Sequence, residues 1–275
     1  MLRKIIPLIL MATPLVTYAG LFNSAPELKC GDVDAVVAAK DWIYNDALGH
    51  LQHDYLSDSS LFFGLPQSDY EQQLRAIPVQ LSDIVTQSSS SEVRSNCSAK
   101  VSAAIPQATL DFLKVLPDTL KEITQGYGQV LNNQVVWKDF TYDIQLADNN
   151  KDIIVTPSQS AYTTTSSIYY MATMAVSKDS IIKKKNDSEV YAAAEAYSGV
   201  DRELNEVWKM LPDSARAALK KEQQTWVNQK SQKCGKLSDA QSETLPAAQR
   251  ISIYQCQSRL TDKRIEYLGG DDTYD

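Results

Sequence analysis

Residues 204–234, LNEVWKMLPDSARAALKKEQQTWVNQKSQKC, determine how the C-terminal part folds. Apolar side chains recur there at three- and four-residue steps on both sides of Pro212, which is the period of an amphipathic helix. Proline cannot continue a helix, and an aspartate after it can cap the next one. We therefore expect two helices that meet at Pro212-Asp213. One face of the first carries Leu204, Val207, Trp208 and Leu211, and one face of the second carries Ala215, Ala218, Leu219, Glu222, Trp226, Lys230 and Cys234.

A third helix is expected near the end of the chain, where Ile253, Cys256, Leu260, Arg264 and Tyr267 recur at the same spacing. A disulfide between Cys234 and Cys256 would tie it to the second helix across a 21-residue loop. Closing such a loop stabilises the folded state by about 3 kcal/mol, and a domain this small needs that contribution. Residues 198–268 are thus expected to form an all-α, disulfide-tied three-helix domain.

These helices resemble the LprI-type lysozyme-inhibitor domain over about residues 200–268. The shared features are an Asn-containing first helix, a Gln-x-x-Trp second helix, and two cysteines before a Leu-Thr-x-x-Arg close. Besides Cys234 and Cys256, the residues that carry the resemblance are Leu204, Asn205, Trp208, Leu211, Arg216, Leu219, Gln223, Trp226, Leu260, Thr261, Arg264 and Leu268. The resemblance implies binding to a cell-wall lytic enzyme. Gln223 and Arg264 are expected to hydrogen-bond helix to helix.

The chain departs from this family in two ways. Members are often lipoproteins, whereas Cys30 follows Glu27-Leu28-Lys29 and lacks a lipobox. The long N-terminal part also lies outside the resemblance.

The N-terminal part, residues 20–157, is expected to be an α+β domain. Helical spacing begins after Asp32, a candidate cap, and apolar–polar alternation predicts strands over 77–86 and 135–146. Returning strands are expected over 93–105 and 153–155, after turns at Ser88–Ser91 and Asp148–Asn150. A further helix candidate, 110–123, contains Pro117. This order predicts a helix on a curved antiparallel sheet, which is cystatin-like in its element order. The helical spacing is carried by Val33, Val36, Val37, Trp42, Ile43 and Leu48.

Residues 158–197 are expected to be a linker or a connecting helix, because 158–167 are rich in serine and threonine. Residues 269–275 form an acidic tail.

Residues 1–19 have the layout of a cleaved secretory signal. Arg3 and Lys4 precede an apolar run of about a dozen residues, and Thr17-Tyr18-Ala19 places small residues at the −3 and −1 positions. A run of that length is too short to cross a bilayer of about 30 Å, and no later segment is long and apolar enough. We expect cleavage near Ala19 and a periplasmic, or secreted, mature protein without stable membrane insertion.

Export makes disulfides the expected state of the four cysteines. Four cysteines allow three connectivities, and the spacing favours the two local pairs, Cys30–Cys97 and Cys234–Cys256. A catalytic thiol is the alternative, but the only two histidines, His50 and His53, lie far from every cysteine in sequence.

The charge is unevenly distributed along the chain. The net charge is −7, and residues 20–160 hold 9 Lys or Arg against 18 Asp or Glu. Residues 197–275 hold 12 of each sign. An acidic balance argues against a nucleic-acid partner and is compatible with steering of a basic enzyme.

The patterns of catalytic and cofactor sites are absent from the sequence. It contains no nucleophile elbow, phosphate loop or dinucleotide fingerprint, and we expect no enzyme activity and no cofactor. His50-x-x-His53-Asp54, with Asp46 one turn earlier, could hold a metal, but a polar helix face is the simpler interpretation. Asp271, Asp272 and Asp275 could attract calcium, but an exposed tail is simpler.

The sequence therefore predicts a periplasmic protein that inhibits a lysozyme or another peptidoglycan hydrolase, as an inhibitor or an immunity protein. The alternative is a non-catalytic cell-envelope assembly or structural factor.

Overall fold

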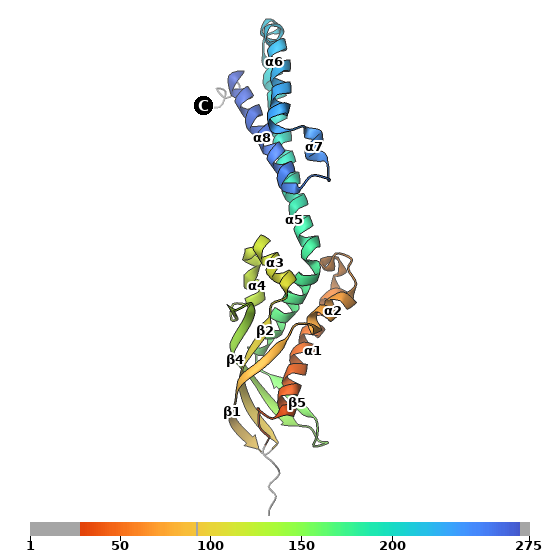
Figure 1. The fold of residues 1–275 in the computed structure, drawn as a ribbon, viewed down its shortest axis with the longest axis vertical. Coiled ribbons are helices and arrows are strands. Elements are labelled where there is room, and N and C mark those ends of the chain that lie inside the picture. Colours follow the sequence, from red (N-terminus) through yellow and green to blue (C-terminus); the bar gives the residue numbers. More distant parts are fainter. Residues whose placement is uncertain (1–27, 92, 270–275) are drawn as a thin grey trace, which may run out of the picture.

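The computed structural model describes residues 28–91 and 93–269 of the 275-residue chain. The expected signal sequence with its cleavage site at Ala19, and residues 270–275 of the expected acidic tail, lie outside these ranges. An α+β part at one end of the molecule is joined by one long helix to a helical region at the other end (Figure 1).

The α+β part is built on an antiparallel sheet. The strands β1 (Val79–Ser91), β2 (Arg94–Ala104), β4 (Gln134–Leu146) and β3 (Gln129–Leu131) lie in that order, and β5 (Ile153–Pro157) also pairs with β4. Every second residue of β2 is buried, so one face of the sheet carries the core. Asp83 adopts φ +51° where the β1–β2 register shifts. This bulge curves the sheet, as the sequence predicts.

Two helices cover the sheet on its core side (Figure 1). The helix α1 (Val33–Ser57) buries Ala35, Ala39, Ile43, Ala47 and Leu51, which recur every four residues. The disulfide Cys30–Cys97 joins the segment before α1 to β2. Two hydroxyls of the neighbouring helix α5 donate to α1 carboxylates, Thr165 to Asp46 at 2.6 Å and Tyr169 to Asp54 at 2.8 Å.

The helix α5 (Ala161–Met210) runs without interruption for 50 residues, which is about 75 Å at 1.5 Å per residue. Its first part lies in the α+β core, where Thr164, Thr165 and Ser167 are fully buried. Its last part packs against the C-terminal helices. The serine- and threonine-rich segment is therefore mostly helix, and the expected connecting helix and the expected first helix of the C-terminal domain are parts of a single helix.

Several local predictions for the α+β part were wrong. Ser88–Ser91 continue β1 rather than forming a turn, because they pair with the first residues of β2. The candidate helix 110–123 is α3 (Gln107–Val115), a 3-10 turn (Pro117–Thr119) and α4 (Leu120–Thr124), since Pro117 has no N–H to continue α3. Asp32 precedes α1 but accepts from Lys29 N at 3.1 Å and makes no side-chain cap. The 3-10 turn Ser59–Phe62, α2 (Gln67–Arg75) and β3 were not predicted.

The helical region contains α6 (Asp213–Cys234), the short α7 (Leu237–Gln241) and α8 (Ala247–Tyr267). The helix α8 packs along the end of α5, and α6 and α7 pack against α8. Its apolar core is small. It consists of two clusters, one around Val190, Ala240 and Tyr254 and the other around Leu204, Val207 and Ile265. The disulfide Cys234–Cys256 joins α6 to α8.

The fold is thus α+β followed by an all-α region, as predicted. Among the described residues, no helix is long and apolar enough to cross a membrane.

Candidate functional site

The end of α6 is fixed to α8 by a covalent bond and by a hydrogen bond. The Cα atoms of Cys234 and Cys256 are 5.4 Å apart. Directly after α6, Gly235 adopts φ +94°, a conformation that side chains disfavour. Its carbonyl accepts from Gln257 Nε2 of α8 at 2.6 Å, and a Cβ at Gly235 would lie 3.2 Å from Ile253 Cγ1. Glycine is therefore required where α6 turns away from α8.

Arg264 of α8 lies buried between the helices, with 6% of its surface exposed. Its Nε donates to Gln223 Oε1 at 2.7 Å, and its Nη1 to Glu222 Oε1 at 2.6 Å. The guanidinium carbon lies 5.6 Å from the ring centroid of Trp226 and 4.6 Å from that of Tyr267. These contacts confirm the predicted helix-to-helix role of Gln223 and Arg264. Arginine suits this position because its planar guanidinium group can donate hydrogen bonds and stack on aromatic rings at the same time.

Lys230 of α6 is a second buried cation, also 6% exposed. Its ammonium donates to Thr261 Oγ1 at 3.1 Å and to Tyr197 Oη at 3.3 Å, and lies 3.9 Å from Asp201 Oδ1. It also lies 4.8 Å from the ring centroid of Trp226. The Trp226 ring is therefore in cation–π contact with both buried cations.

Burial sets the protonation behaviour of this cluster. Removal from water lowers the pKa of the Lys230 ammonium, and the nearby Asp201 carboxylate offsets that shift only in part. Burial, followed by the negative charge of Asp201, raises the pKa of the Tyr197 phenol. Both groups lie where α5, α6 and α8 meet.

The remaining motif residues do not converge on a single point. Leu204 is buried with Ile265, and Leu268 packs against the same cluster. Asn205 is exposed and donates to the Asp201 carbonyl at 2.8 Å, within its own helix. Arg216 pairs with Asp213 at the turn between α5 and α6. Trp208, Leu211, Leu219 and Leu260 are half-buried.

The segment from Lys236 to Leu245, here called the 236–245 loop, projects sideways from the helices (Figure 1). It contains α7 and is held against α8. Ala240 is fully buried, and its carbonyl accepts a hydrogen bond from Arg250 Nε of α8 at 2.8 Å. Ser242 and Thr244 bond to each other through their hydroxyls at 2.7 Å. The loop therefore presents polar residues and is held in place by its contacts with the helices. Loops on a rigid scaffold commonly carry binding residues.

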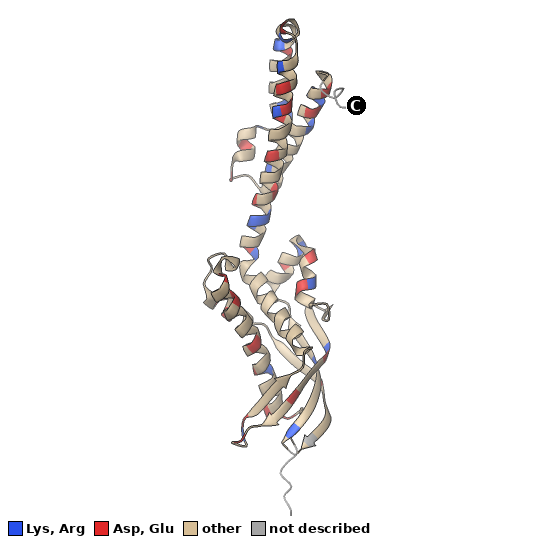
Figure 2. Ribbon diagram, turned by 180° about the vertical axis from the view of Figure 1, so that it is seen from behind, with Lys and Arg blue, Asp and Glu red and all other residues tan. Residues whose placement is uncertain are grey.

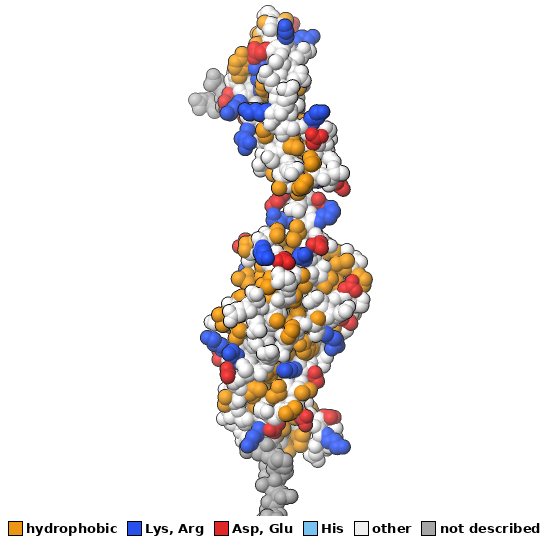
Figure 3. All heavy atoms as spheres, in the orientation of Figure 1, with side chains coloured by type: hydrophobic (Ala, Val, Ile, Leu, Met, Phe, Trp, Pro, Cys, Tyr) orange, Lys and Arg blue, Asp and Glu red, His pale blue; other side chains and the backbone are white. Residues whose placement is uncertain are grey.

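The charge of the helical region differs from that of the α+β part. Residues 182–268 hold 15 Lys or Arg and 12 Asp or Glu, a net charge of +3. Figure 2 shows residues of both signs mixed along these helices, whereas acidic residues are prominent on α1. Figure 3 shows the same mixture on the surface of the helical region, with hydrophobic side chains only in small patches.

The candidate metal ligands on α1, which are His50, His53, Asp46 and Asp54, do not form a metal site. His50 lies 3.5 Å from Asp46, and Asp46 and Asp54 accept hydrogen bonds from α5 as described above. Within residues 28–91 and 93–269, no three potential ligands lie together as a metal site would require. The acidic residues 271–275 lie outside the described ranges.

The sequence patterns did not assign the partners of Lys230. Lys230 itself was placed on the α6 stripe, but Tyr197 and Asp201 lie at the edge of the expected domain and carry no motif. Their spacing of four residues, which places both on one helix face, is the only local signal.

Residues 182–268 match the family model described as lysozyme inhibitor LprI. The match begins within α5 and continues through α6 and α7 to just beyond the end of α8, so it takes in the disulfide, both buried cations and the 236–245 loop. It covers less than half of the chain and begins upstream of the residues in which the resemblance was recognised. No curated protein and no solved structure matches the chain.

Proposed function

We propose, from the match of residues 182–268 to lysozyme inhibitor LprI, that the mature protein binds and inhibits a lysozyme or another peptidoglycan-degrading enzyme. That match is the single observation that carries the proposal. The protein would act by occupying the enzyme's surface and would turn over no substrate, either as an inhibitor or as an immunity protein against a delivered hydrolase.

The expected periplasmic location of the protein agrees with this role. The two disulfides are typical of proteins that fold outside the reducing cytosol. Residues 1–19 have the features of a cleaved export signal. An exported, periplasmic protein would meet cell-wall lytic enzymes in the compartment where they act.

The structure supports the 236–245 loop as the contact surface. The loop begins two residues after Cys234, so the disulfide holds the chain close to its start, and α8 begins two residues after its end. Its outer side presents Lys236, Ser238, Asp239, Glu243 and Thr244, all of which are exposed. A polar surface held rigid before binding loses little entropy on association, which favours affinity.

The buried cations would support this surface without touching the enzyme. Arg264 and Lys230 hold α6 against α8, and the loop connects these two helices. Loss of the Arg264 contacts would loosen the base of the loop.

Binding of the oxidised mature protein to a panel of lysozymes and amidases, measured by biolayer interferometry, tests the proposal. Thr244→Arg places a long cation in the 236–245 loop and should weaken binding to the target enzyme at least tenfold. Thr225→Arg is the matched control, because Thr225 is exposed on α6 away from the loop. Equal binding by both variants would exclude the loop as the contact, and absence of binding to every enzyme would contradict the function.

The alternative, a non-catalytic cell-envelope assembly or structural factor, draws support from the shape of the molecule. The long α5 separates the α+β part from the helical region (Figure 1), as in a spacer with a binding element at each end. In the same panel, this alternative predicts no lytic enzyme as a partner.

A further inference from the structure

The α+β part contains a pocket that the inhibitor match does not include. The pocket has a volume of about 370 Å³ and lies beside β4, the end of β3 and the start of α5. It is at the small end of the range for small-molecule sites, which begins at about 300 Å³. The pocket lies within residues 127–164, outside the matched range 182–268.

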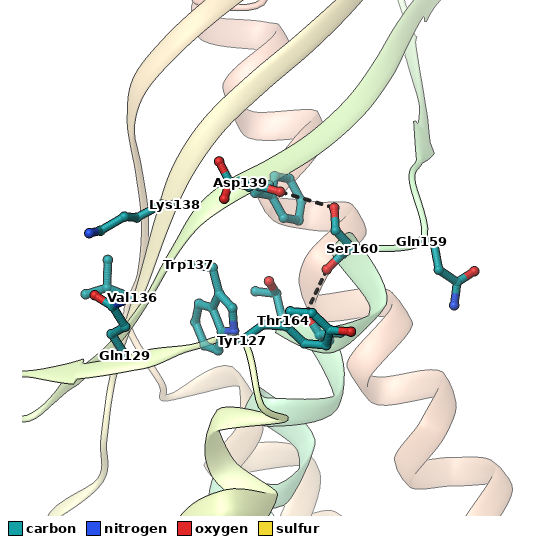
Figure 4. Close-up of a pocket in the computed structure, with 11 residues that line it drawn as sticks. Tyr127, Gln129, Val136, Trp137, Lys138, Asp139, Gln159, Ser160 and Thr164 are labelled. Carbon is teal, nitrogen blue, oxygen red and sulfur yellow. Dashed lines mark hydrogen bonds between the residues drawn. The ribbon is translucent and has the colours of Figure 1, made fainter.

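Two residues that line the pocket each carry a buried polar atom without a hydrogen-bond partner among the described residues. The atoms are Nε1 of Trp137, whose side chain belongs to a residue 3% exposed, and Oγ1 of Thr164, which is fully buried. Buried polar groups are paired in most proteins, because an unpaired one retains its desolvation cost. Figure 4 shows Trp137, Thr164 and Tyr127 next to one another at one end of the pocket, with Lys138 and Gln159 pointing away from them.

The Trp137 indole is held in place by the chain opposite. A Cβ on Gly128 would lie 2.5 Å from Val135 Cγ1 and 2.9 Å from Trp137 Nε1, so the backbone at Gly128 lies directly against the ring. The next residue back, Tyr127, is 75% exposed and forms part of the lining. Trp137, whose indole N–H is unpaired, and the exposed ring of Tyr127 therefore belong to the lining of the same pocket.

The pocket occupies a gap in the edge of the sheet. On this edge β3 pairs with Gln134–Val136 and β5 with Tyr142–Leu146, which leaves 137–141 of β4 between them. A peptide strand does not fit the gap, because the Asp139 carbonyl accepts from Ser160 Oγ at 3.1 Å and the Thr141 carbonyl from Ser158 N at 3.1 Å. Because these backbone carbonyls already accept hydrogen bonds, a ligand in this gap would bind to side chains and not to the backbone of β4.

We propose that this pocket binds an uncharged sugar that carries an acetamido group, such as N-acetylglucosamine. An indole N–H can only donate, so the ligand must offer an acceptor, and the acetamido carbonyl provides one. The methyl of that group would contact Val136 and Phe140, which also line the pocket. The exposed ring of Tyr127 would pack against the apolar face of the pyranose.

The other lining side chains fit the same ligand. Gln129 and Asp139 offer an amide and a carboxylate group for sugar hydroxyls. Lys138 and Asp139 are the only charged residues of the lining and have opposite signs, so the pocket favours neither an anion nor a cation. The proposal does not depend on enzyme inhibition. It would give the α+β part a contact with glycan chains while the helical region acts on a protein.

The test is a titration of the 15N-labelled mature chain, followed through the indole N–H signals of its four tryptophans. The probes are N,N′-diacetylchitobiose, cellobiose as the matched disaccharide without acetamido groups, and an acetyl-trialanine amide peptide. Trp137→Phe assigns the relevant signal. We expect diacetylchitobiose to shift the Trp137 signal in a saturable way, and neither other probe to do so.

Three variants complete the test. Thr164→Val removes the unpaired hydroxyl and should weaken binding about fivefold to tenfold, the effect of one hydrogen bond. Ser167→Ala removes another buried, unpaired hydroxyl of α5 that does not line the pocket, and should leave binding unchanged. Tyr127→Ala, at an exposed position where folding is not at risk, should also weaken binding. No shift with diacetylchitobiose, an equal shift with cellobiose, or a shift with the peptide alone would overturn the proposal.

Discussion

Nε of Arg264 donates a 2.7 Å hydrogen bond to Oε1 of Gln223, which lies 41 residues earlier in the chain. These two residues belong to different parts of the inhibitor motif, and the contact joins α8 to α6. The motif residues at this contact thus specify how the helices pack. The exposed residues that would contact an enzyme lie elsewhere on the region.

The first prediction concerns this contact. Arg264→Lys keeps the positive charge but loses the fork that bonds Gln223 and Glu222, and it should lower the free energy of unfolding by about 1–3 kcal/mol. Urea denaturation followed by circular dichroism measures the change. Arg259→Lys is the matched control, since Arg259 is exposed on the same helix. Equal effects of the two substitutions would show that the hydrogen bonds of the buried Arg264 guanidinium contribute nothing to the free energy of unfolding.

The second prediction concerns the disulfide between α6 and α8. Joint replacement of Cys234 and Cys256 by serine should cost about 3 kcal/mol, because the unfolded chain regains the entropy of a loop with a sequence separation of 22. The small apolar core of the helical region leaves little to offset that loss. Thermal unfolding should then separate into two transitions, with the helical region melting first. A single unchanged transition would contradict this account.

Much of the fold could be predicted from periodicity. Pro212 follows the end of α5, and the spacing predicted α6, α8 and the disulfide between them. It did not predict which side chains are buried. Of the expected α6 face only Lys230 is buried, and of the expected α8 face only Arg264. The continuity of α5 could not be predicted, because serine and threonine have modest helix propensity and 158–167 resemble a boundary. Burial of Thr164, Thr165 and Ser167 against the α+β core outweighs that local preference. Ser88–Ser91 belong to β1 for a similar reason, because their pairing with β2 outweighs the preference of serine for turns.

The site was predicted only where one motif contained both partners. Gln223 and Arg264 both carry the family pattern, so their contact could be inferred. Lys230 depends on Tyr197 and Asp201 from α5, and only the packed structure brings these residues together. The pocket beside Trp137 likewise unites residues from β3, β4 and α5, whose proximity no local spacing indicates.

The third prediction concerns Lys230. Lys230→Met should leave stability at pH 7 unchanged or raise it, because a buried ammonium carries a desolvation cost. No partner would be left unpaired, since Thr261 Oγ1 still donates to the Gln257 carbonyl at 2.8 Å and Tyr197 still donates to Asp201 at 3.0 Å. A loss of stability comparable to that of Arg264→Lys would contradict this account.

The pH dependence of the same pair of proteins provides a separate check. The pKa of Lys230 is lowered in the folded protein, so the unfolded chain binds more protons between the folded pKa and 10.5. The free energy of unfolding of the wild type should therefore rise relative to that of Lys230→Met as pH increases through this window. Parallel pH profiles for the two proteins would show that the ammonium is not desolvated.

The fourth prediction concerns Tyr142 in the α+β part. Its hydroxyl is buried without a partner among the described residues, and burial raises the pKa of Tyr142 to about 12 from 10.0. Tyr142→Phe should therefore stabilise the protein by about 1 kcal/mol at pH 7, by removing an unpaired polar group.

The advantage of Tyr142→Phe should grow at alkaline pH. Above pH 10 the tyrosine of the unfolded chain ionises while the folded one stays neutral, so the wild type loses stability up to about pH 12. The difference should increase by about 1.4 kcal/mol per pH unit within that window. Denaturant titrations from pH 8 to 11.5 measure it, and a constant difference would contradict the burial of the phenol.

A lysis assay measures directly whether the helical region inhibits a peptidoglycan hydrolase. Folded, oxidised mature protein is titrated against lysozymes and amidases acting on a peptidoglycan suspension. We expect at least one of these enzymes to lose nearly all activity near one equivalent of protein. Thr225→Arg should inhibit equally, and Thr244→Arg should require a large excess. Full activity of every enzyme in the presence of excess protein would contradict the account.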